Sequence, residues 1–241
     1  MAVSYPLTWD QTGEHFYKTG IDRGVIYDYD ETNNKYTNGE AWNGLTGFTK
    51  SPSGAEETKL YADNIKYLSL RSAEDFGATI TCYTYPALFE KKNGAVAIES
   101  APGVRVYQQA RKSFGLCVRT LLGNDTDGND KGYELHLMYG LTASPSEESF
   151  NTVNDSPEAI EFSYELSSVP VNVTKTAGGK AIKPTAIITI NSLEVLAASR
   201  LGLLEEKLYG KAASGSDPAV PAELPMPDDV IAIMDGTYAA G

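Results

Sequence analysis

Few residues of this chain have the types and spacing that catalysis needs. Only two histidines are present, His15 and His136, and neither lies in a recognisable nucleophile or metal pattern. A serine triad would have to use one of them, and the sequence holds no GxSxG. It also holds no GxGxxG opening a helix and no GxxxxGK[ST], so nucleotide binding lacks support. His136 alternates with the apolar residues of its predicted strand, and we interpret it as a surface or interface histidine.

The acidic turn Asp125–Asp130 is the one candidate for a calcium loop. Counted from Asp125, an EF-hand requires glycine at position 130 and glutamate at position 136. The chain has Asp130 and His136 there, and the flanking residues predict strands rather than helices. The sequence therefore favours a plain hairpin turn over a metal site.

The remaining reactive groups also favour structural roles. Glu56-Glu57 and Glu147-Glu148 lie in polar loops, whereas a pair of glycosidase acids needs a cleft around it. Cys82 and Cys117 form no CxxC or Cys/His pattern. We predict two buried free thiols, with a single disulfide as the alternative. We expect no enzyme activity, no cofactor and no catalytic or metal-binding residue.

The composition indicates a globular protein and argues against binding to nucleic acid. The 241 residues are 41% hydrophobic and 22% charged, and they are enough for one well-buried domain. The 15 tyrosines favour strands and half-wet interfaces. A net charge of −12 argues against binding by phosphate neutralisation. The start lacks a signal-peptide pattern and no apolar run approaches a membrane span, so we expect synthesis in a cytoplasm without membrane insertion.

Alternation and turn residues predict a mainly β chain, richest in the stretch Trp42–Tyr85. His15–Tyr29 predicts two short strands, and Asp28–Glu40 an exposed loop or hairpin tip. Asp63-Asn64 suggests a bulge or break within a strand. The other predicted strands are Trp42–Lys50, Lys59–Arg71, Ala78–Tyr85, Phe114–Leu122, Tyr133–Leu141, Ala159–Leu166 and Thr185–Ile190.

One long amphipathic helix is predicted at Ser192–Tyr209, with Asn191 and Glu194 in a capping-box-like pattern. A short helix is predicted at Ala87–Lys92. The leucines expected to pack on a sheet are Leu193, Leu196, Leu201, Leu204 and Leu208. We divide the chain into a β-domain with this flanking helix, residues 1–210, and a Pro/Ala-rich extended segment, residues 211–241. The short apolar run Val230–Met234 in that segment can dock on the body or on a neighbour.

Several long blocks resemble one known family. They are TGEHFYKTGIDRGVIYDYD, the Trp42–Thr46 block, SPSGAEETKLYADNIKYLSLRSAEDFGATITCYTYP, the run from Arg111 to Phe150 and NDSPEAIEFSYELSSVPV. Together these blocks are similar to the major tail tube protein of long-tailed bacteriophages and related prophages. The resemblance spans roughly residues 9–210.

The resemblance implies a fold and a set of partners. The fold would be two packed sheets, a β-sandwich or barrel-like core, with one flanking amphipathic helix. Copies of the chain would form hexameric rings that stack into a tube in the virion tail. The tape-measure protein would occupy this tube, and the tail terminator and the baseplate or distal tail proteins would bind its ends. DNA would pass through without specific binding. Six copies at −12 each would carry 72 formal negative charges, which repel phosphates over roughly 8–10 Å.

For the inner wall of such a tube we select Glu134, Glu161 and Glu165, because they oppose the apolar faces of two cleanly alternating strands. For contacts between subunits or rings we select exposed-loop residues. These are Asp30, Tyr36, Trp42 and Phe48. Simple core packing is the equal alternative for Trp42.

Two other classes stay open at this stage. A carbohydrate- or cell-wall-binding β-sandwich module on a virion or surface would use the tyrosines and tryptophans. A β-fold hydrolase would use acidic residues. Formation of rings or tubes separates a tail tube protein from a monomeric glycan-binding module. Activity lost on substitution of a single carboxylate would indicate the hydrolase.

Overall fold

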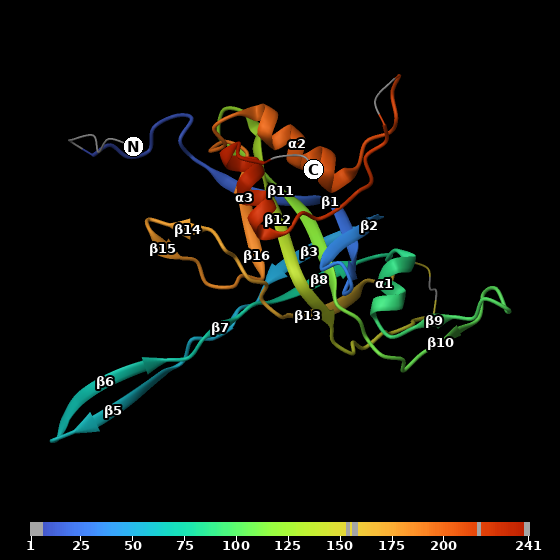
Figure 1. The fold of residues 1–241 in the computed structure, drawn as a ribbon, viewed down its shortest axis with the longest axis horizontal. Coiled ribbons are helices and arrows are strands. Elements are labelled where there is room, and N and C mark those ends of the chain that lie inside the picture. Colours follow the sequence, from blue (N-terminus) through green and yellow to red (C-terminus); the bar gives the residue numbers. More distant parts are fainter. Residues whose placement is uncertain (1–6, 153–154, 156–158, 216–217, 239–241) are drawn as a thin grey trace.

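The chain folds around one eight-stranded antiparallel sheet, seen in a computed structural model that describes residues 7–152, 155, 159–215 and 218–238 (Figure 1). The strands of this sheet are β1 (Tyr17–Asp30), β2 (Lys35–Trp42), β3 (Leu45–Lys50), β8 (Gly77–Cys82), β11 (Phe114–Asn124), β12 (Gly128–Ala143), β13 (Phe162–Ser168) and β16 (Ile187–Asn191).

The strand order is β2-β1-β11-β12-β13-β8-β3, with β16 pairing beside β12. One edge of β12 is covered by β11. The other edge is shared, since residues 134–138 pair with β16 and residues 141–143 pair with β13. The sheet therefore curls, and the two ends of the order approach each other. A Cβ on Gly24 of β1 would lie only 2.3 Å from Leu45 Cδ1 of β3. The described strands nevertheless form no closed barrel.

Three helices and four small ribbons complete the fold as far as the structure describes it. The helices are α1 (Ala87–Lys92), α2 (Ala198–Tyr209) and α3 (Pro227–Asp235). The ribbons are β4 (Ser53–Gly54) with β7 (Glu74–Asp75), β5 (Glu57–Ala62) with β6 (Ile65–Arg71), β9 (Val96–Ala97) with β10 (Arg105–Val106), and β14 (Thr176–Ala177) with β15 (Lys180–Ala181). None of the described helices is long and apolar enough to span a membrane.

The helix-side core lies between α2, α3 and one face of the sheet. Alternate residues of β12, Leu135, Leu137 and Tyr139, point into it. From α2 come Leu201, Leu204 and Leu208, and from α3 Val230 and Ile233. Two buried tyrosine hydroxyls in this core donate to backbone carbonyls, that of Tyr27 to Leu208 at 2.7 Å and that of Tyr139 to Pro225 at 2.9 Å.

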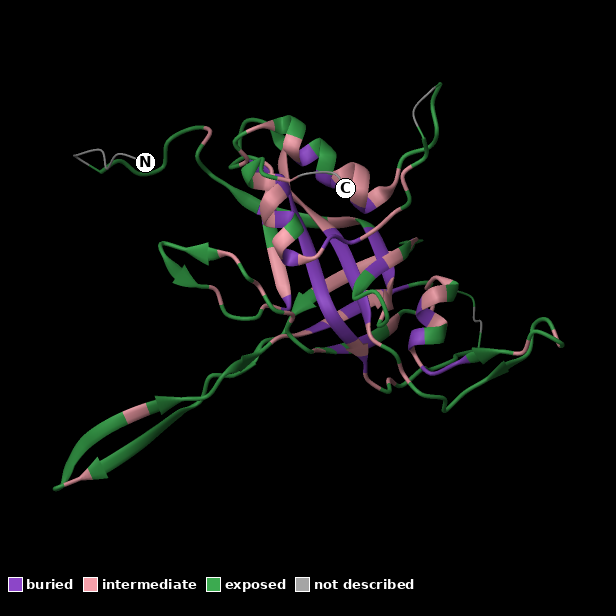
Figure 2. Ribbon diagram, viewed as in Figure 1, coloured by how far each residue is buried: buried purple, intermediate pink, exposed green. Residues whose placement is uncertain are grey.

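The inner core lies on the opposite face, inside the curl of the sheet. It receives Met138, Leu141 and Ala143 from β12 together with alternate residues of β8 and β13. Phe89 of α1 closes one end, 4.6 Å from Trp42 and 4.8 Å from Tyr164 between ring centroids. Figure 2 shows the result, with β11 and β12 buried along most of their length at the centre of the molecule.

The sequence predicted much of this architecture. The mainly β class is confirmed, as are the hairpin of β11 and β12, the bounds of α1 and the two buried free thiols, Cys82 and Cys117. The two predicted layers belong to one continuous sheet rather than to two sheets. Within the predicted extended segment, residues 227–235 form α3, which packs on the sheet through Val230 and Ile233.

The long helix predicted at Ser192–Tyr209 is correct only from Ala198 onwards. The Asn191 carbonyl and side-chain oxygens accept the backbone N–H groups of Glu194 and Leu193, so the predicted capping pattern closes a turn instead. Leu193 and Leu196 precede the helix and are exposed. The stretch Lys59–Arg71, predicted as a strand with a bulge or break at Asp63-Asn64, has the break: it turns back on itself there and forms a hairpin.

The interpretation of His136 as a surface residue was wrong, since only 4% of it is exposed. It alternates with the helix-side residues of β12, but the other face of this strand is covered as well. Its Nε2 lies 2.9 Å from the Thr120 hydroxyl and its Nδ1 lies 3.3 Å from that of Thr189. Burial, together with the Lys50 ammonium, lowers the pKa of His136 to about 4.

This histidine should make stability depend on pH. Between about pH 6.5 and pH 4 the unfolded chain binds a proton at His136 and the folded chain does not, so stability falls as the pH falls. The loss should reach about 3 kcal/mol. Urea unfolding at pH 7 and pH 4.5 measures it. His136→Gln keeps a polar side chain and should show a flatter dependence, and equal slopes for both proteins would contradict the assignment.

Candidate assembly surfaces

The residues tested for chemistry do not converge in the structure. His15 lies at the surface with its Nδ1 3.2 Å from Asp125 Oδ2. The Asp125 carboxylate also accepts the backbone N–H of Gly13 at 3.0 Å, so it fixes the N-terminal segment to the β11–β12 turn. Burial raises the pKa of Cys117 to about 12, which keeps this thiol protonated and unreactive. Among the described residues, no three His, Cys, Asp or Glu side chains come together as a metal site.

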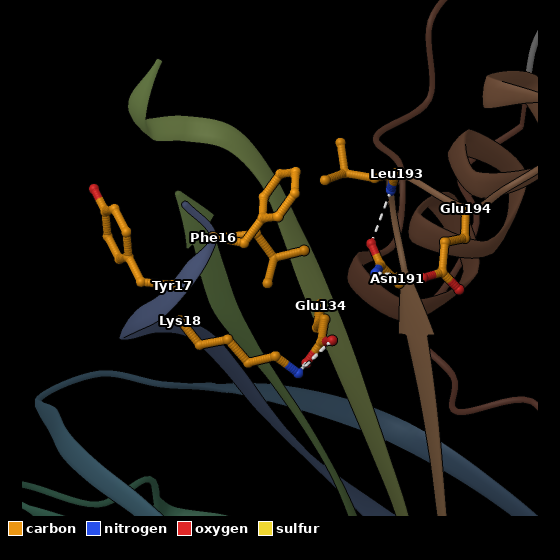
Figure 3. Close-up of a pocket in the computed structure, with 8 residues that line it drawn as sticks. Phe16, Tyr17, Lys18, Glu134, Asn191, Leu193 and Glu194 are labelled. Atoms are coloured by element: carbon orange, nitrogen blue, oxygen red, sulfur yellow. Dashed lines mark hydrogen bonds and ion pairs between the residues drawn. The ribbon is translucent and has the colours of Figure 1, made fainter. Parts of the chain in front are cut away.

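A surface pocket of about 490 Å³ lies beside the start of β1 and is lined by Phe16, Tyr17, Leu122 and Leu193 (Figure 3). Glu134 contributes to its lining and is only 6% exposed. Both carboxylate oxygens of Glu134 accept from Lys18 Nζ, at 2.7 and 2.8 Å.

Glu134 was predicted as an acid of a tube wall. As the chain folds, it is buried and its charge is compensated by Lys18, because the face of β12 opposite the helices is also covered. We therefore no longer include Glu134 among the candidate residues of the tube wall.

Glu161 and Glu165 behave differently. They alternate with Phe162, Tyr164 and Leu166, whose side chains belong to or pack on the inner core, and both carboxylates are exposed. Cross-strand pairing places Glu165 opposite Thr79 and Ser163 opposite Thr81. Glu161 accepts a hydrogen bond from the Thr46 hydroxyl, whose oxygen in turn accepts from the Thr81 hydroxyl at 2.9 Å.

The outer side of the β3–β8–β13 layer thus forms a polar face. We define it by Thr46, Thr49, Thr79, Thr81, Glu161, Ser163 and Glu165. These side chains carry hydroxyl and carboxylate groups only. Such a surface is hydrated and anionic, and its defining residues offer phosphate groups no cation to bind.

The second surface is an arm, residues 53–75, that projects far from the body (Figure 1). The short β4–β7 pair forms its base and the β5–β6 hairpin forms its end. Asp63 and Asn64, with φ of +52° and +61°, make the two-residue turn that suits a hairpin of this kind. Nearly the whole arm is exposed in Figure 2.

The two faces of the arm differ in chemistry. Opposed residues of a hairpin share a face, so Leu60 lies with Leu68 and Leu70 with Thr58. The other face near the base carries Lys59, Ser69, Glu57 and Arg71. Tyr61 and Tyr67, near the tip, are 69% and 72% exposed. The arm is thus an amphipathic ribbon whose apolar side chains contact solvent.

The predicted contact residues take different positions. Trp42 and Tyr36 are 3% and 2% exposed, so their rings belong to the core and are not available to a neighbour in this conformation. The Trp42 Nε1 donates to the Thr84 carbonyl at 3.0 Å. Phe48 packs on the inner core, 5.9 Å from the His136 ring. Asp30 accepts from the backbone N–H groups of Thr32 and Asn33 in the β1–β2 turn. Contact roles for Phe48 and Asp30 stay predictions.

Sequence reasoning missed the arm as a contact surface because it left a bulge or a strand break open at Asp63-Asn64 and did not predict a hairpin there. The signal was present at Asp63-Asn64, where two residues that tolerate positive φ separate two runs rich in leucine and tyrosine. Such a pair between strand-like runs predicts a hairpin better than a bulge.

Of the comparisons with known proteins, the one with solved structures gives matches. No protein-family model and no curated protein matches the chain. Similar solved structures include the sheath–tube complex of the extracellular contractile injection system PVC in its extended state, at 13% identity and a TM-score of 0.32, covering 70% of this chain and 88% of that one.

Two further structures are the anti-feeding prophage cap, which terminates the AFP tube, and the PVC sheath/tube terminator in its extended state. Both are 12% identical, with TM-scores of 0.33 and 0.31. The first comparison covers 79% of this chain and 95% of that one, and the second covers 78% and 99%. At these identities and TM-scores, the likeness identifies no function for the chain.

Trypsin should attack the arm before the body. Lys59, Lys66 and Arg71 are exposed on a ribbon to which the described residues add no third strand, and such a ribbon opens easily. Brief digestion of the unassembled chain should therefore cut at these three residues before it cuts within the eight-stranded sheet or the helices, as read by mass spectrometry. Lys92, which is buried beside Asp28, and Arg119, which is paired with Asp22, are the controls that should resist. Earlier cleavage at either control would show that the arm is not more accessible than the sheet and the helices.

Proposed function

We propose that this chain is a structural, non-enzymatic protein that assembles with copies of itself into a phage-type tail tube. Six copies close into a ring, the rings stack, and DNA passes through the bore into the host. The sequence resemblance to major tail tube proteins supports this function. The observation that carries it is the arm, an amphipathic ribbon that the chain builds but does not cover.

The low stability of an isolated hairpin and its exposed apolar face indicate that the arm has a partner. An isolated two-stranded hairpin is marginally stable in water, and one apolar face in solvent adds a risk of aggregation. Burying one leucine side chain contributes about 1.5–3 kcal/mol. Leu60, Leu68 and Leu70 together therefore provide a large driving force for association, while the body already has two cores of its own.

The polar face supports the proposed bore. Glu161 and Glu165 lie on the outer side of a layer whose inner side is sealed by the inner core. Repeated around a ring, hydroxyl and carboxylate groups would repel a DNA backbone rather than hold it. In this proposal the tape-measure protein fills the bore before DNA does, and terminator and baseplate or distal tail proteins bind the tube's ends. The assembled particle is a virion tail, put together in the cytoplasm of the host.

The first test removes the apolar face of the arm. The triple variant Leu60→Ser, Leu68→Ser and Leu70→Ser should stay folded, because all three side chains point away from both cores. Its association should weaken by a factor of about 10³ or more. Light scattering and negative-stain microscopy of the purified full chain measure the loss of rings or tubes.

The matched control changes three exposed valines near another small hairpin. Val96, Val104 and Val106 lie on or beside the β9–β10 ribbon, and their replacement by serine alters a similar apolar area. This control should assemble normally. A wild-type chain that stays monomeric at every concentration, and binds glycans instead, would overturn the proposal in favour of a binding module.

The second test changes the charge of the polar face. The double variant Glu161→Lys and Glu165→Lys should assemble but retain DNA. This retention should weaken steeply with salt, with a slope close to 0.9 per phosphate contact. Filter binding to assembled particles at several salt concentrations measures it. Glu31→Lys with Glu99→Lys gives the same net charge at exposed sites off the polar face, and equal DNA retention by both variants would remove the polar face from the bore.

A further inference from the structure

Acidic and basic residues are segregated along one part of the sequence. Residues 132–174 hold seven acidic residues and no lysine or arginine, whereas residues 175–183 hold three lysines and no acidic residue. Two copies of a chain with a net charge of −12 repel each other, so a contact between copies is favoured where a basic region meets an acidic one. The three lysines therefore mark a candidate contact surface.

These lysines lie on the β14–β15 hairpin, which the fold holds in a defined position. Its two-residue turn is Gly178-Gly179, with φ of +57° and +77°, as a tight hairpin turn of this kind requires. The Asp228 carboxylate of α3 accepts the backbone N–H of Thr174 at 2.9 Å and its hydroxyl at 2.8 Å. The strand that enters the hairpin is thus fixed to α3. We name residues 173–184 the basic hairpin.

The end of the basic hairpin is positive on both of its sides. Cross-strand pairing and alternation put Lys175 and Lys180 on one side, and the same alternation continued to Lys183 puts that residue on the other. Lys175 Nζ lies 3.9 Å from Asp235 Oδ2. Lys180 and Lys183 are exposed and enter no ion pair among the described residues, so their charges are available to carboxylates of another molecule.

The matching surface is the acidic loop, as we name residues 144–152. Glu147 and Glu148 are exposed in it. Glu148 accepts from the Tyr164 hydroxyl at 3.0 Å, and the Tyr164 ring lies 4.8 Å from that of Phe89 in α1. These contacts fix the acidic loop on the α1 side of the sheet.

An exposed apolar side chain accompanies the charges on each surface. Phe150 follows the two glutamates of the acidic loop and is 73% exposed, and Val169, shortly before the basic hairpin, is 70% exposed. Contact between the two surfaces would remove both side chains from water, which adds a hydrophobic contribution to the charge pairing.

The two surfaces lie too far apart to meet within one chain. The basic hairpin is tied to α3, which packs on the helix-side core, whereas the acidic loop lies near α1, which packs on the inner core across the sheet. In Figure 1 the β14–β15 hairpin and α1 lie on opposite sides of the body. A contact between two different surfaces of identical chains is heterologous, and repetition of such a contact builds a closed ring or an open stack.

We propose that the basic hairpin of one copy binds the acidic loop of a second copy, with Lys180 and Lys183 against Glu147 and Glu148. Phe150 and Val169 pack together in this contact. The inference rests on the proposed function and names a pair of surfaces through which the copies associate.

Photo-crosslinking tests the contact directly. Phe150 of the full chain is replaced by p-benzoylphenylalanine, and ¹⁵N-labelled and unlabelled copies are mixed before assembly and irradiation. Peptides that join the two isotopes come from different copies, and the expected product links residue 150 to residues 169–184 of the other copy. The same probe in place of Phe16 should give no such link. Phe16 is 63% exposed and precedes β1 at the end of β12 that lies far from the acidic loop.

A charge exchange provides the second measurement. Lys180→Glu with Lys183→Glu should lower the yield of this product by about tenfold. Adding Glu147→Lys and Glu148→Gln should restore the yield, since glutamine keeps an acceptor for the Tyr164 hydroxyl.

The matched control for the reversed lysines is Lys35→Glu with Lys211→Glu. It gives the same net charge at exposed sites outside the basic hairpin and should leave the yield unchanged.

Three outcomes would overturn the inference, and they separate it from the proposed function. If chains still form tubes but residue 150 links only to other regions of a second copy, the basic hairpin is rejected and self-assembly stands. A yield that is indifferent to reversal of Lys180 and Lys183 in chains that still form tubes leads to the same conclusion. A chain that stays monomeric and gives no link between copies would reject both.

Discussion

The fold depends on β12 being buried on both of its faces. In an extended strand successive side chains point to opposite sides, so one strand can seal two separate cores. Leu135, Leu137 and Tyr139 face the helices, while Met138 and Leu141 face the inside of the curl. The arrangement forces polar residues of the same strand into buried positions, and this is why Glu134 needs Lys18 and why His136 is held neutral between two threonine hydroxyls. The polar face and the arm, the surfaces that the proposed function uses, then lie at the margins of the fold.

How much of the fold could be predicted from the sequence depends on how far apart in the sequence the interacting residues lie. Local signals were sufficient for the β11–β12 hairpin, for α1 and for the buried leucines of α2, because alternation and helical spacing act within a few residues. They failed for His136, since a strand that alternates apolar with polar residues looks half exposed unless its second covering layer is known. The burial of Trp42 and Tyr36 likewise depends on distant segments, the first packing on Phe89 and the second pairing with Leu224.

The candidate surfaces divide in the same way. Alternation over β13 and the residue before it placed Glu165 and Glu161 on one exposed face, and pairing of β13 with β8 extends that face with threonines, as a regular antiparallel register requires. Glu134 followed the same rule in its own strand and yet is buried, because coverage of a face is a tertiary property. The capping-like residues Asn191 and Glu194 stabilise a turn instead of a helix, which leaves Leu193 and Leu196 outside both cores. Polar side chains of this kind form whichever local hydrogen bonds the surrounding packing allows.

In the proposed assembly, the narrow base of the arm has a kinetic consequence. The β4–β7 pair contributes only two residues on each side, so the hairpin beyond it is tethered to the body rather than built into it. Once one such tether has bound, every further contact between the same two bodies becomes an intramolecular event at an effective concentration in the millimolar range. Growth on an existing oligomer would then outpace the first encounter between free chains. A lag before elongation is the natural behaviour of a polymer made this way, and it would give the cell control over where elongation starts.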